Sequence, residues 1–184
     1  MKSRQLAALT ALVVIAVLAL PAGVAAQDNA TQPQKPKHHT YKLIDMGTFG
    51  GPNSFLSGPT VRTLTNGGLF VGGADTNVPN PNYPNSNPYF TGQDPVIQHA
   101  FKWQKGIVTD LGALPGINNS FTNSANDNGL IVGVSENGLF DPFTGFPQVA
   151  SVLWKNGKII NLGSLGGNQT LAIGINPFAM ARKL

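Results

Sequence analysis

Residues 98–112 read QHAFKWQKGIVTDLG, and residues 149–163 read VASVLWKNGKIINLG. The two stretches align without a gap, so that Trp103 and Trp154 lie 51 residues apart. A repeat of this period predicts tandem supersecondary units, because one such unit buries its apolar face only by packing against its neighbours. The doubled stretch therefore predicts a repeat architecture.

Two further elements recur outside the doubled stretch. The turn IDMGTFGG at residues 44–51 is matched by TDLGALPG at 109–116 and INLGSLGG at 160–167. The segment NGGLFVGGAD at 66–75 is matched by DNGLIVGVSE at 127–136. A complete unit thus consists of a Leu-Gly turn, an Asn-Gly hairpin and an aromatic strand. The third copy of the pattern ends at Asn176, where PFAMARKL follows.

Short apolar runs separated by Gly, Asn and Pro predict an all-β fold. In the first unit we expect strands at 41–46, 60–65, 69–74 and 100–103, with a strand at 107–111 opening the next unit. Type I′ turns, which need positive φ at both central residues, are expected at four dipeptides: Asn66-Gly67, Lys105-Gly106, Asn128-Gly129 and Asn156-Gly157.

Four strands in about 50 residues are typical of a propeller blade. The expected architecture is therefore a tandem array of four-stranded antiparallel repeats, as β-propeller-like blades: about two blades plus a fragment, in an incomplete ring. Two interpretations of the break at Asn176 stay open. The chain is either a truncated product of a larger propeller or a compact two-sheet β structure that is complete as it stands.

The alternation of these motifs resembles the HAF family of bacterial extracellular repeat proteins, named after a His-Ala-Phe motif that is found here at His99, Ala100 and Phe101. The resemblance covers Tyr41 to about Asn176. In the second unit the triplet is replaced by Ala150, Ser151 and Val152, which indicates that the fold does not require the histidine. The family resemblance implies a secreted bacterial protein, and the family has no established enzymatic activity.

The N-terminus has the pattern of a secretory signal peptide. Lys2 and Arg4 precede an apolar run from Leu6 to Leu20, and small residues follow up to Ala26. This run is shorter than the roughly 20 residues of a membrane-spanning helix, so we expect cleavage near Ala26 and export, either extracellular or periplasmic. The expected organisation is a signal peptide (1–26), a flexible leader (27–40), a repeat domain (41–176, with units 41–106, 107–157 and a partial 158–176) and a non-repeat tail (177–184).

Composition narrows the class of partner. The formal net charge of +4 falls to +2 once Lys2 and Arg4 are removed, and the remaining basic residues are scattered, so neither nucleic acid nor a membrane is an expected partner. The chain has no cysteine, so an exported form is stabilised by packing and not by disulfides.

The insertion at residues 74–95 makes the first unit longer than the second and holds most candidate binding residues. Oxygen ligands for calcium are offered by Asp75, Asn77 and Asp94, although their spacing matches no calcium loop. Aromatic side chains exposed on a proline-stiffened loop would suit a carbohydrate or protein ligand, which makes Tyr83, Tyr89 and Phe90 ligand-binding candidates. The structural alternative is a rigid surface loop without a ligand.

The histidines offer little metal chemistry. His38 and His39 are adjacent, and neighbouring side chains rarely converge on one zinc ion. His99 begins an aromatic strand, where it is either a further ligand-binding candidate or the partner in a hydrogen bond at the edge of a blade.

The acidic residues could form a pair for glycoside hydrolysis, but their repeat positions favour another role. Asp45 and Asp110 are equivalent, and the third copy has Asn161, which predicts turn caps that accept backbone N–H bonds. Asp127 lies beside a hairpin for the same reason, while Glu136 and Asp141 are the other acids considered. We therefore assign no catalytic residue and no cofactor. The expected function is a non-catalytic scaffold, binding or adhesion module; the alternatives are an exported carbohydrate-active or calcium-dependent enzyme, or a non-functional fragment of a larger propeller.

Overall fold

A computed structural model describes residues 40–56, 61–90 and 94–180 of the chain. The chain divides into two compact units, Met1–Leu43 and Ile44–Leu184. The described residues of the first unit, 40–43, form neither helix nor strand. The expected signal peptide, together with His38 and His39, lies outside the described residues. Within the described part of the chain, no helix is long and apolar enough to cross a membrane.

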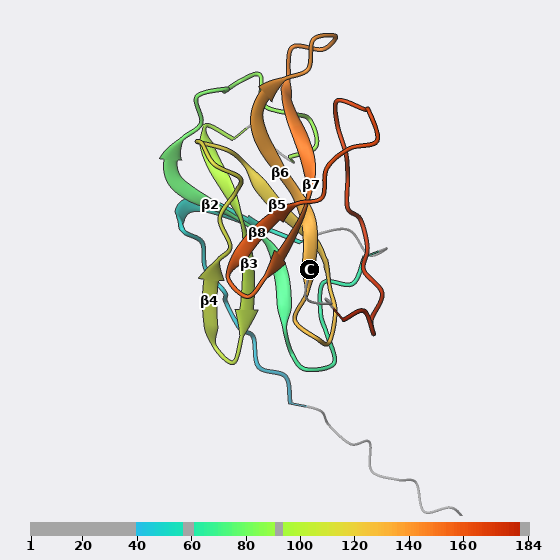
Figure 1. Cartoon of the computed structure of the whole chain (residues 1–184). Coiled ribbons are helices and arrows are strands. Elements are labelled where there is room, and N and C mark those ends of the chain that lie inside the picture. Colours follow the sequence, from blue (N-terminus) through green and yellow to red (C-terminus); the bar gives the residue numbers. More distant parts are fainter. Residues whose placement is uncertain (1–39, 57–60, 91–93, 181–184) are drawn as a thin grey trace, which may run out of the picture. The chain divides into compact units, whose positions relative to one another are not determined.

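The second unit contains two four-stranded antiparallel sheets, so the all-β prediction is confirmed (Figure 1). Each sheet follows chain order, and β4, which the repeat pattern placed at the start of the second unit, is the edge strand of the first sheet. The first sheet comprises β1 (Gly50–Phe55), β2 (Phe70–Pro79), β3 (Val96–Gln104) and β4 (Ile107–Asp110). The second sheet comprises β5 (Ser120–Ala125), β6 (Ile131–Phe140), β7 (Pro147–Lys155) and β8 (Lys158–Asn161).

The hairpins that join the last two strands of each sheet have the predicted type I′ geometry. Lys105 and Asn156 both have φ of 52°, and Gly106 and Gly157 follow with φ of 87° and 74°. Positive φ at both central residues matches the twist of the flanking strands, which is why a two-residue loop suffices.

The Asn-Gly hairpins differ from the prediction. Positive φ occurs at Gly68 and Gly129 alone, so Asn66-Gly67 and Asn128-Gly129 are not type I′ pairs. The loop that precedes β2 instead has three residues, because the N–H of Thr65 donates to the carbonyl of Leu69 at 2.9 Å. A glycine in the left-handed region at the third loop position is the usual solution for such a loop.

The first strand of the first sheet is the clearest correction. The predicted strand at 41–46 is wrong, since the described residues there form no strand. The predicted strand at 60–65 reduces to an isolated bridge between Leu64 and Phe70. The position beside β2 is taken by β1, where a Cβ on residue 51 would lie 2.4 Å from the Cβ of Asp75, so Gly51 is the residue that permits the approach.

The two sheets enclose a shared hydrophobic core. β5 lies against β2 and β3: the N–H of Ala100 donates to Ser120 Oγ at 2.9 Å, and Thr122 Oγ1 donates to the carbonyl of Gly72 at 2.8 Å. Gly73 has no side chain where the ring of Phe121 packs, at 2.4 Å from a hypothetical Cβ. The buried core residues are Leu69, Val71, Ala100, Ala125, Ile131, Val152 and Trp154.

The third repeat copy runs along the second sheet without forming a strand (Figure 1). The N–H of Thr170 donates to the carbonyl of Val149 at 3.0 Å, and Thr170 Oγ1 accepts from the N–H of Ser151 at 2.8 Å. Farther along, Asn126 Nδ2 donates to the carbonyl of Asn176 at 3.2 Å. The segment is therefore held at several points by residues of the second sheet and its hairpin.

Candidate functional site

Three repeat-equivalent side chains cap the Leu-Gly turns, as predicted. Asp45, Asp110 and Asn161 each accept, through Oδ1, the N–H of the glycine two residues on, at 2.9, 2.7 and 2.8 Å. Each of these glycines has a positive φ, between 66° and 78°. The shared contact explains why an amide can replace the carboxylate, since only an acceptor oxygen is needed.

Asp127 and Asp141 are bound in turns as well. Asp141 Oδ1 accepts from the N–H groups of Phe143 and Thr144 at 2.8 and 3.0 Å, and these bonds lower the pKa of Asp141. Asp127 does not cap its own hairpin as predicted. It receives Arg62 Nη2 at 2.9 Å on both oxygens and the N–H of Asn66 at 2.8 Å, and the Arg62 bond is the main reason that its pKa is lowered. Asp127 thus links the equivalent hairpins of the two units.

Two further acids, Asp75 and Glu136, are completely buried. They occupy equivalent positions on β2 and β6 and make equivalent bonds. Asp75 Oδ2 accepts the N–H of Asn53 at 3.0 Å, and Glu136 Oε2 accepts the N–H of Asn119 at 2.8 Å. Burial raises the pKa of both, and the nearby charge of Asp94 raises that of Asp75 further. Asp75 Oδ1 and Glu136 Oε1 have no hydrogen-bond partner.

His99 pairs with a carboxylate at the edge of the first sheet. Its Nδ1 lies 2.9 Å from Asp110 Oδ2. Burial by itself raises the pKa of Asp110, but the hydrogen bonds from His99 and from the N–H of Gly112 outweigh it, so that the pKa is lowered. Among the residues that the structure describes, no group of three or more His, Asp or Glu side chains is placed to hold a metal ion.

The insertion is docked on the second sheet and is not a free surface loop, which corrects the prediction for two of its aromatic residues. Phe90 is buried against Val134 and Val149. Tyr89 is half-buried, and its hydroxyl lies 2.8 Å from Asn123 Oδ1. Tyr83 alone of the three candidates is well exposed, at 51%. An array of exposed aromatic side chains for ligand stacking is therefore absent among these three residues.

The three calcium candidates lie in different surroundings. Asp75 is buried, Asn77 is exposed, and Asp94 lines a small cavity beside Gln98 and Asn119. Gln98 is the residue that sequence reasoning missed: it is buried, and neither polar atom of its amide has a partner. The signal that could have found it is its position, since a glutamine at an inward position of an apolar strand needs a polar neighbour.

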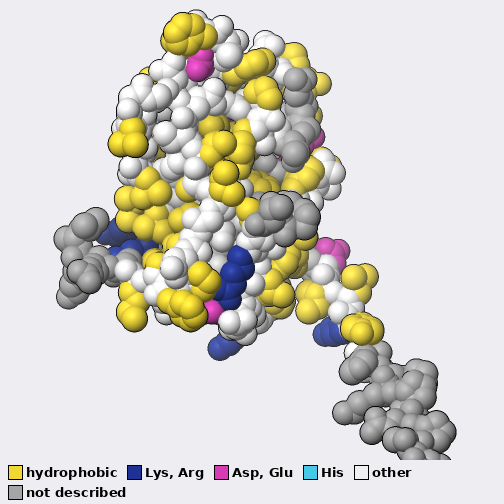
Figure 2. Space-filling model, turned by 90° about the vertical axis from the view of Figure 1, so that its right-hand side faces the viewer, with side chains coloured by type: hydrophobic (Ala, Val, Ile, Leu, Met, Phe, Trp, Pro, Cys, Tyr) yellow, Lys and Arg dark blue, Asp and Glu magenta, His cyan; other side chains and the backbone are white. Residues whose placement is uncertain are grey.

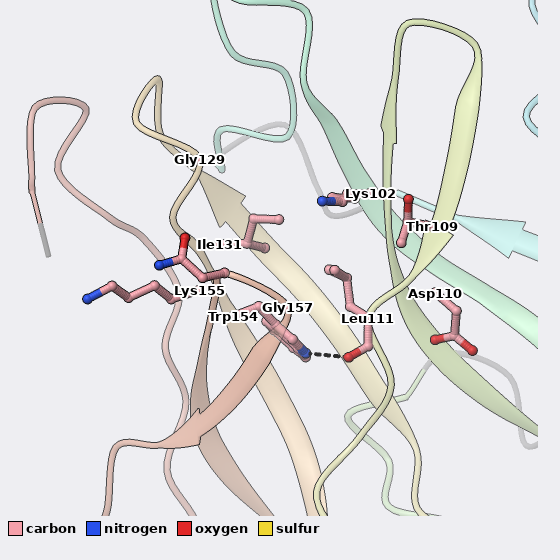
Figure 3. A pocket seen from close by; sticks show the side chains of 10 residues that line it. Lys102, Thr109, Asp110, Leu111, Gly129, Ile131, Trp154, Lys155 and Gly157 are labelled. Atoms are coloured by element: carbon pink, nitrogen blue, oxygen red, sulfur yellow. Dashed lines mark hydrogen bonds between the residues drawn. The ribbon is translucent and has the colours of Figure 1, made fainter.

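A shallow pocket of about 100 Å³ lies between the edge of the first sheet and the last hairpin of the second (Figure 3). Lys102, Asp110 and Lys155 stand around it. Trp154 is on its floor, and the indole Nε1 donates to the carbonyl of Leu111 at 3.0 Å. Only 3% of Trp154 is exposed, so its ring face is not open for stacking against a sugar.

Exposed apolar side chains gather on the third repeat copy, on the side of the molecule that Figure 2 faces. Leu162 and Leu165 are 52% and 109% exposed, whereas their second-copy equivalents Leu111 and Leu114 pack on the core. The other exposed apolar residues there are Leu171, Ile173, Phe178 and Met180. The third copy thus has the apolar pattern of a core-forming segment, but these apolar side chains are exposed.

Comparison of the chain with family models, with curated proteins and with solved structures gives no match. The resemblance to the HAF family therefore stays a prediction.

Proposed function

We propose that this chain is a secreted, non-catalytic repeat protein of the β-propeller-like kind, and that it works as a scaffold or binding module. Its protein partner is a further four-stranded sheet of the same repeat type, which docks on the third repeat copy. One observation carries the proposal: the third copy binds the second sheet through the same hydrogen bond by which β5 binds the first sheet.

The equivalence extends over two bonds at each junction. At the first junction, the N–H of Ala100 donates to Ser120 Oγ at 2.9 Å, and at the second the N–H of Ser151 donates to Thr170 Oγ1 at 2.8 Å. The preceding turns match too, because Leu111 N–H donates to the carbonyl of Ala100 and Leu162 N–H to the carbonyl of Ser151, both at 2.9 Å. These matching bonds support the proposal that the third copy begins a next sheet.

The third copy lacks what β5 has on its other side. β5 pairs along its length with β6, whereas residues 171–175 belong to no strand. A sheet of the same type would pair with this backbone and cover Leu171 and Ile173, which are now exposed. Addition of a strand to an open edge supplies main-chain hydrogen bonds together with pockets for alternate side chains.

The acids support a non-catalytic role. Six of the seven described carboxylates accept a backbone N–H bond: Asp45, Asp75, Asp110, Asp127, Glu136 and Asp141. A glycosidase needs two carboxylates on either side of one bond, with one held protonated and one free to act. Acids that hold separate turns and strand starts instead account for their spacing in the repeat.

A labelled peptide with the sequence DNGLIVGVSEN, which copies residues 127–137, tests the docking proposal. We expect the chain to bind this peptide in a fluorescence anisotropy titration, and a scrambled peptide to bind at least tenfold more weakly. Ile173→Pro removes a backbone N–H from the proposed edge and should abolish binding. Leu139→Asp, at an exposed position on β6, is the matched control and should leave binding intact.

Equal binding of the two peptides, or unchanged binding by Ile173→Pro, would contradict the proposal. Export is tested separately, by the N-terminal sequence of the protein recovered from outside the bacterial cytoplasm, which we expect to begin at Gln27.

A further inference from the structure

Two buried polar side chains lie side by side on one face of the first sheet, and some of their polar atoms have no hydrogen-bond partner. Asp75 on β2 and Gln98 on β3 are register partners, and both are buried, with exposures of 0% and 4%. Directly opposite residues of an antiparallel pair project to the same face of the sheet. Asp75 Oδ1 and both amide atoms of Gln98 lack partners. A buried polar group that stays unpaired destabilises the fold, so a ligand that paired with these atoms would be favoured here.

A small cavity adjoins Gln98, one member of this pair. Gln98 lines it together with Asn119 and with Asn80, Ser86 and Asp94 of the insertion. Its volume is about 10 Å³, which is close to the space that one water molecule or one ion fills. The two insertion residues Asn80 and Ser86 are joined by a bond from Asn80 Nδ2 to Ser86 Oγ at 2.8 Å.

Two carboxyl groups lie near each other at this place. Asp94 is close enough to Asp75 for its charge to raise the pKa of that buried carboxyl, after the larger effect of burial. Among the described residues, neither acid forms an ion pair with a lysine or arginine. His99, the neighbour of Gln98 on β3, is engaged with Asp110.

We propose that a calcium ion binds here, between β2, β3 and the insertion, with oxygens of Asp75, Asp94 and Gln98 as ligands. The ion would offset both carboxylates and give Asp75 Oδ1 and Gln98 Oε1 the partner they lack. Hard cations of this kind take carboxylate and amide oxygens, and these are the donors present. The site is independent of the docking proposed for the third copy, and it differs from the set suggested by the sequence because Gln98 replaces Asn77.

Isothermal titration of the chelator-treated chain with calcium chloride tests the site, with thermal unfolding as a second readout. We expect one calcium ion per chain and a melting temperature that rises with calcium concentration, as for any ligand that binds only the folded state. Asp75→Asn and Asp94→Asn should each weaken calcium binding at least tenfold. Asp45→Asn, at an exposed turn cap, keeps an acceptor for Gly47 N–H and should bind like the parent chain.

Asp75→Asn is also informative about folding, because it removes a buried charge. Without calcium it should melt no lower than the parent chain, so a loss of calcium binding cannot be ascribed to unfolding. The proposal is overturned if calcium shifts neither heat nor melting temperature, or if the shift is the same in Asp75→Asn. A melting temperature that rises only as the pH falls, with no response to calcium, would assign the site to a proton.

Discussion

Substitution by alanine should have effects of different size at the two equivalent tryptophans. Trp154 is 3% exposed, lies in the core shared by the two sheets, and donates its indole N–H to the carbonyl of Leu111. Trp103 occupies the same place in the first sheet, but it is only half-buried and is not part of that core. Replacing each with alanine therefore compares the same side chain with and without a neighbouring sheet.

We expect Trp154→Ala to lower the free energy of unfolding by about 3–5 kcal/mol, the usual cost of removing a large aromatic side chain from a packed core. Trp103→Ala should cost less than about 2 kcal/mol, because water already reaches that side chain. Trp154→Phe retains a buried ring and leaves the Leu111 carbonyl without its donor, which should cost about 1–3 kcal/mol.

Urea unfolding followed by far-ultraviolet circular dichroism measures these changes without relying on tryptophan fluorescence, and an unchanged m-value would show that the compactness of the end states is preserved. The reasoning is refuted if Trp154→Ala costs less than about 1 kcal/mol, or if the two alanine variants are equally destabilised. Either result would mean that the two sheets do not share a packed core around Trp154.

Two further changes test the pairing of β5 with β6 and the response of stability to pH. Gly133→Ala should be strongly destabilising in urea unfolding, because its Cβ would lie 2.0 Å from the carbonyl oxygen of Phe121, whereas Gly174→Ala meets no atom within 4 Å and should be neutral. Asp110 has a lowered pKa in the folded chain, so its contribution to stability is complete above its unfolded pKa, near 3.8, and is lost as the pH falls through the lower folded value. Asp110→Asn removes the charge that faces His99 and should therefore lower stability at pH 7. In acid-unfolding curves this variant should also lose less stability than the parent chain below about pH 4.

The features that could be predicted from the sequence are local ones. Asp45, Asp110 and Asn161 cap turns by bonds that span two residues, so the pattern of acceptor, any residue and glycine contains the whole interaction. The Lys105-Gly106 hairpin is likewise determined by two residues and the strands beside them. Such contacts recur wherever the repeat recurs, and the alignment of copies was enough to find them.

The features that were missed depend on residues far apart in the chain. β1 forms where Gly51 allows a close approach to Asp75, and the sequence near residue 51 does not indicate that Asp75 is its neighbour. Phe90 looked like an exposed loop aromatic because its cover, Val134 and Val149, belongs to the second sheet. A loop's composition gives its stiffness but not the surface against which it packs, so exposure was the least predictable property of the insertion.

Comparison of the equivalent buried acids shows why the proposed cation site would belong to the first unit alone. Asp75 accepts the N–H of Asn53 in β1, and Glu136 accepts the N–H of Asn119 just before β5, so this bond to the first strand of each sheet is part of the repeated fold. In the second unit Trp154 lies 21 positions after Gly133, whereas in the first Trp103 lies 31 positions after Gly72. The ten extra residues bring Asp94 beside Asp75 and close the cavity next to Gln98, the position that Val149 takes in the second sheet. The repeat thus supplies a buried carboxylate twice, whereas the second carboxylate, Asp94 of the insertion, and the amide oxygen of Gln98 on β3 occur in the first unit only, which is where we propose the cation.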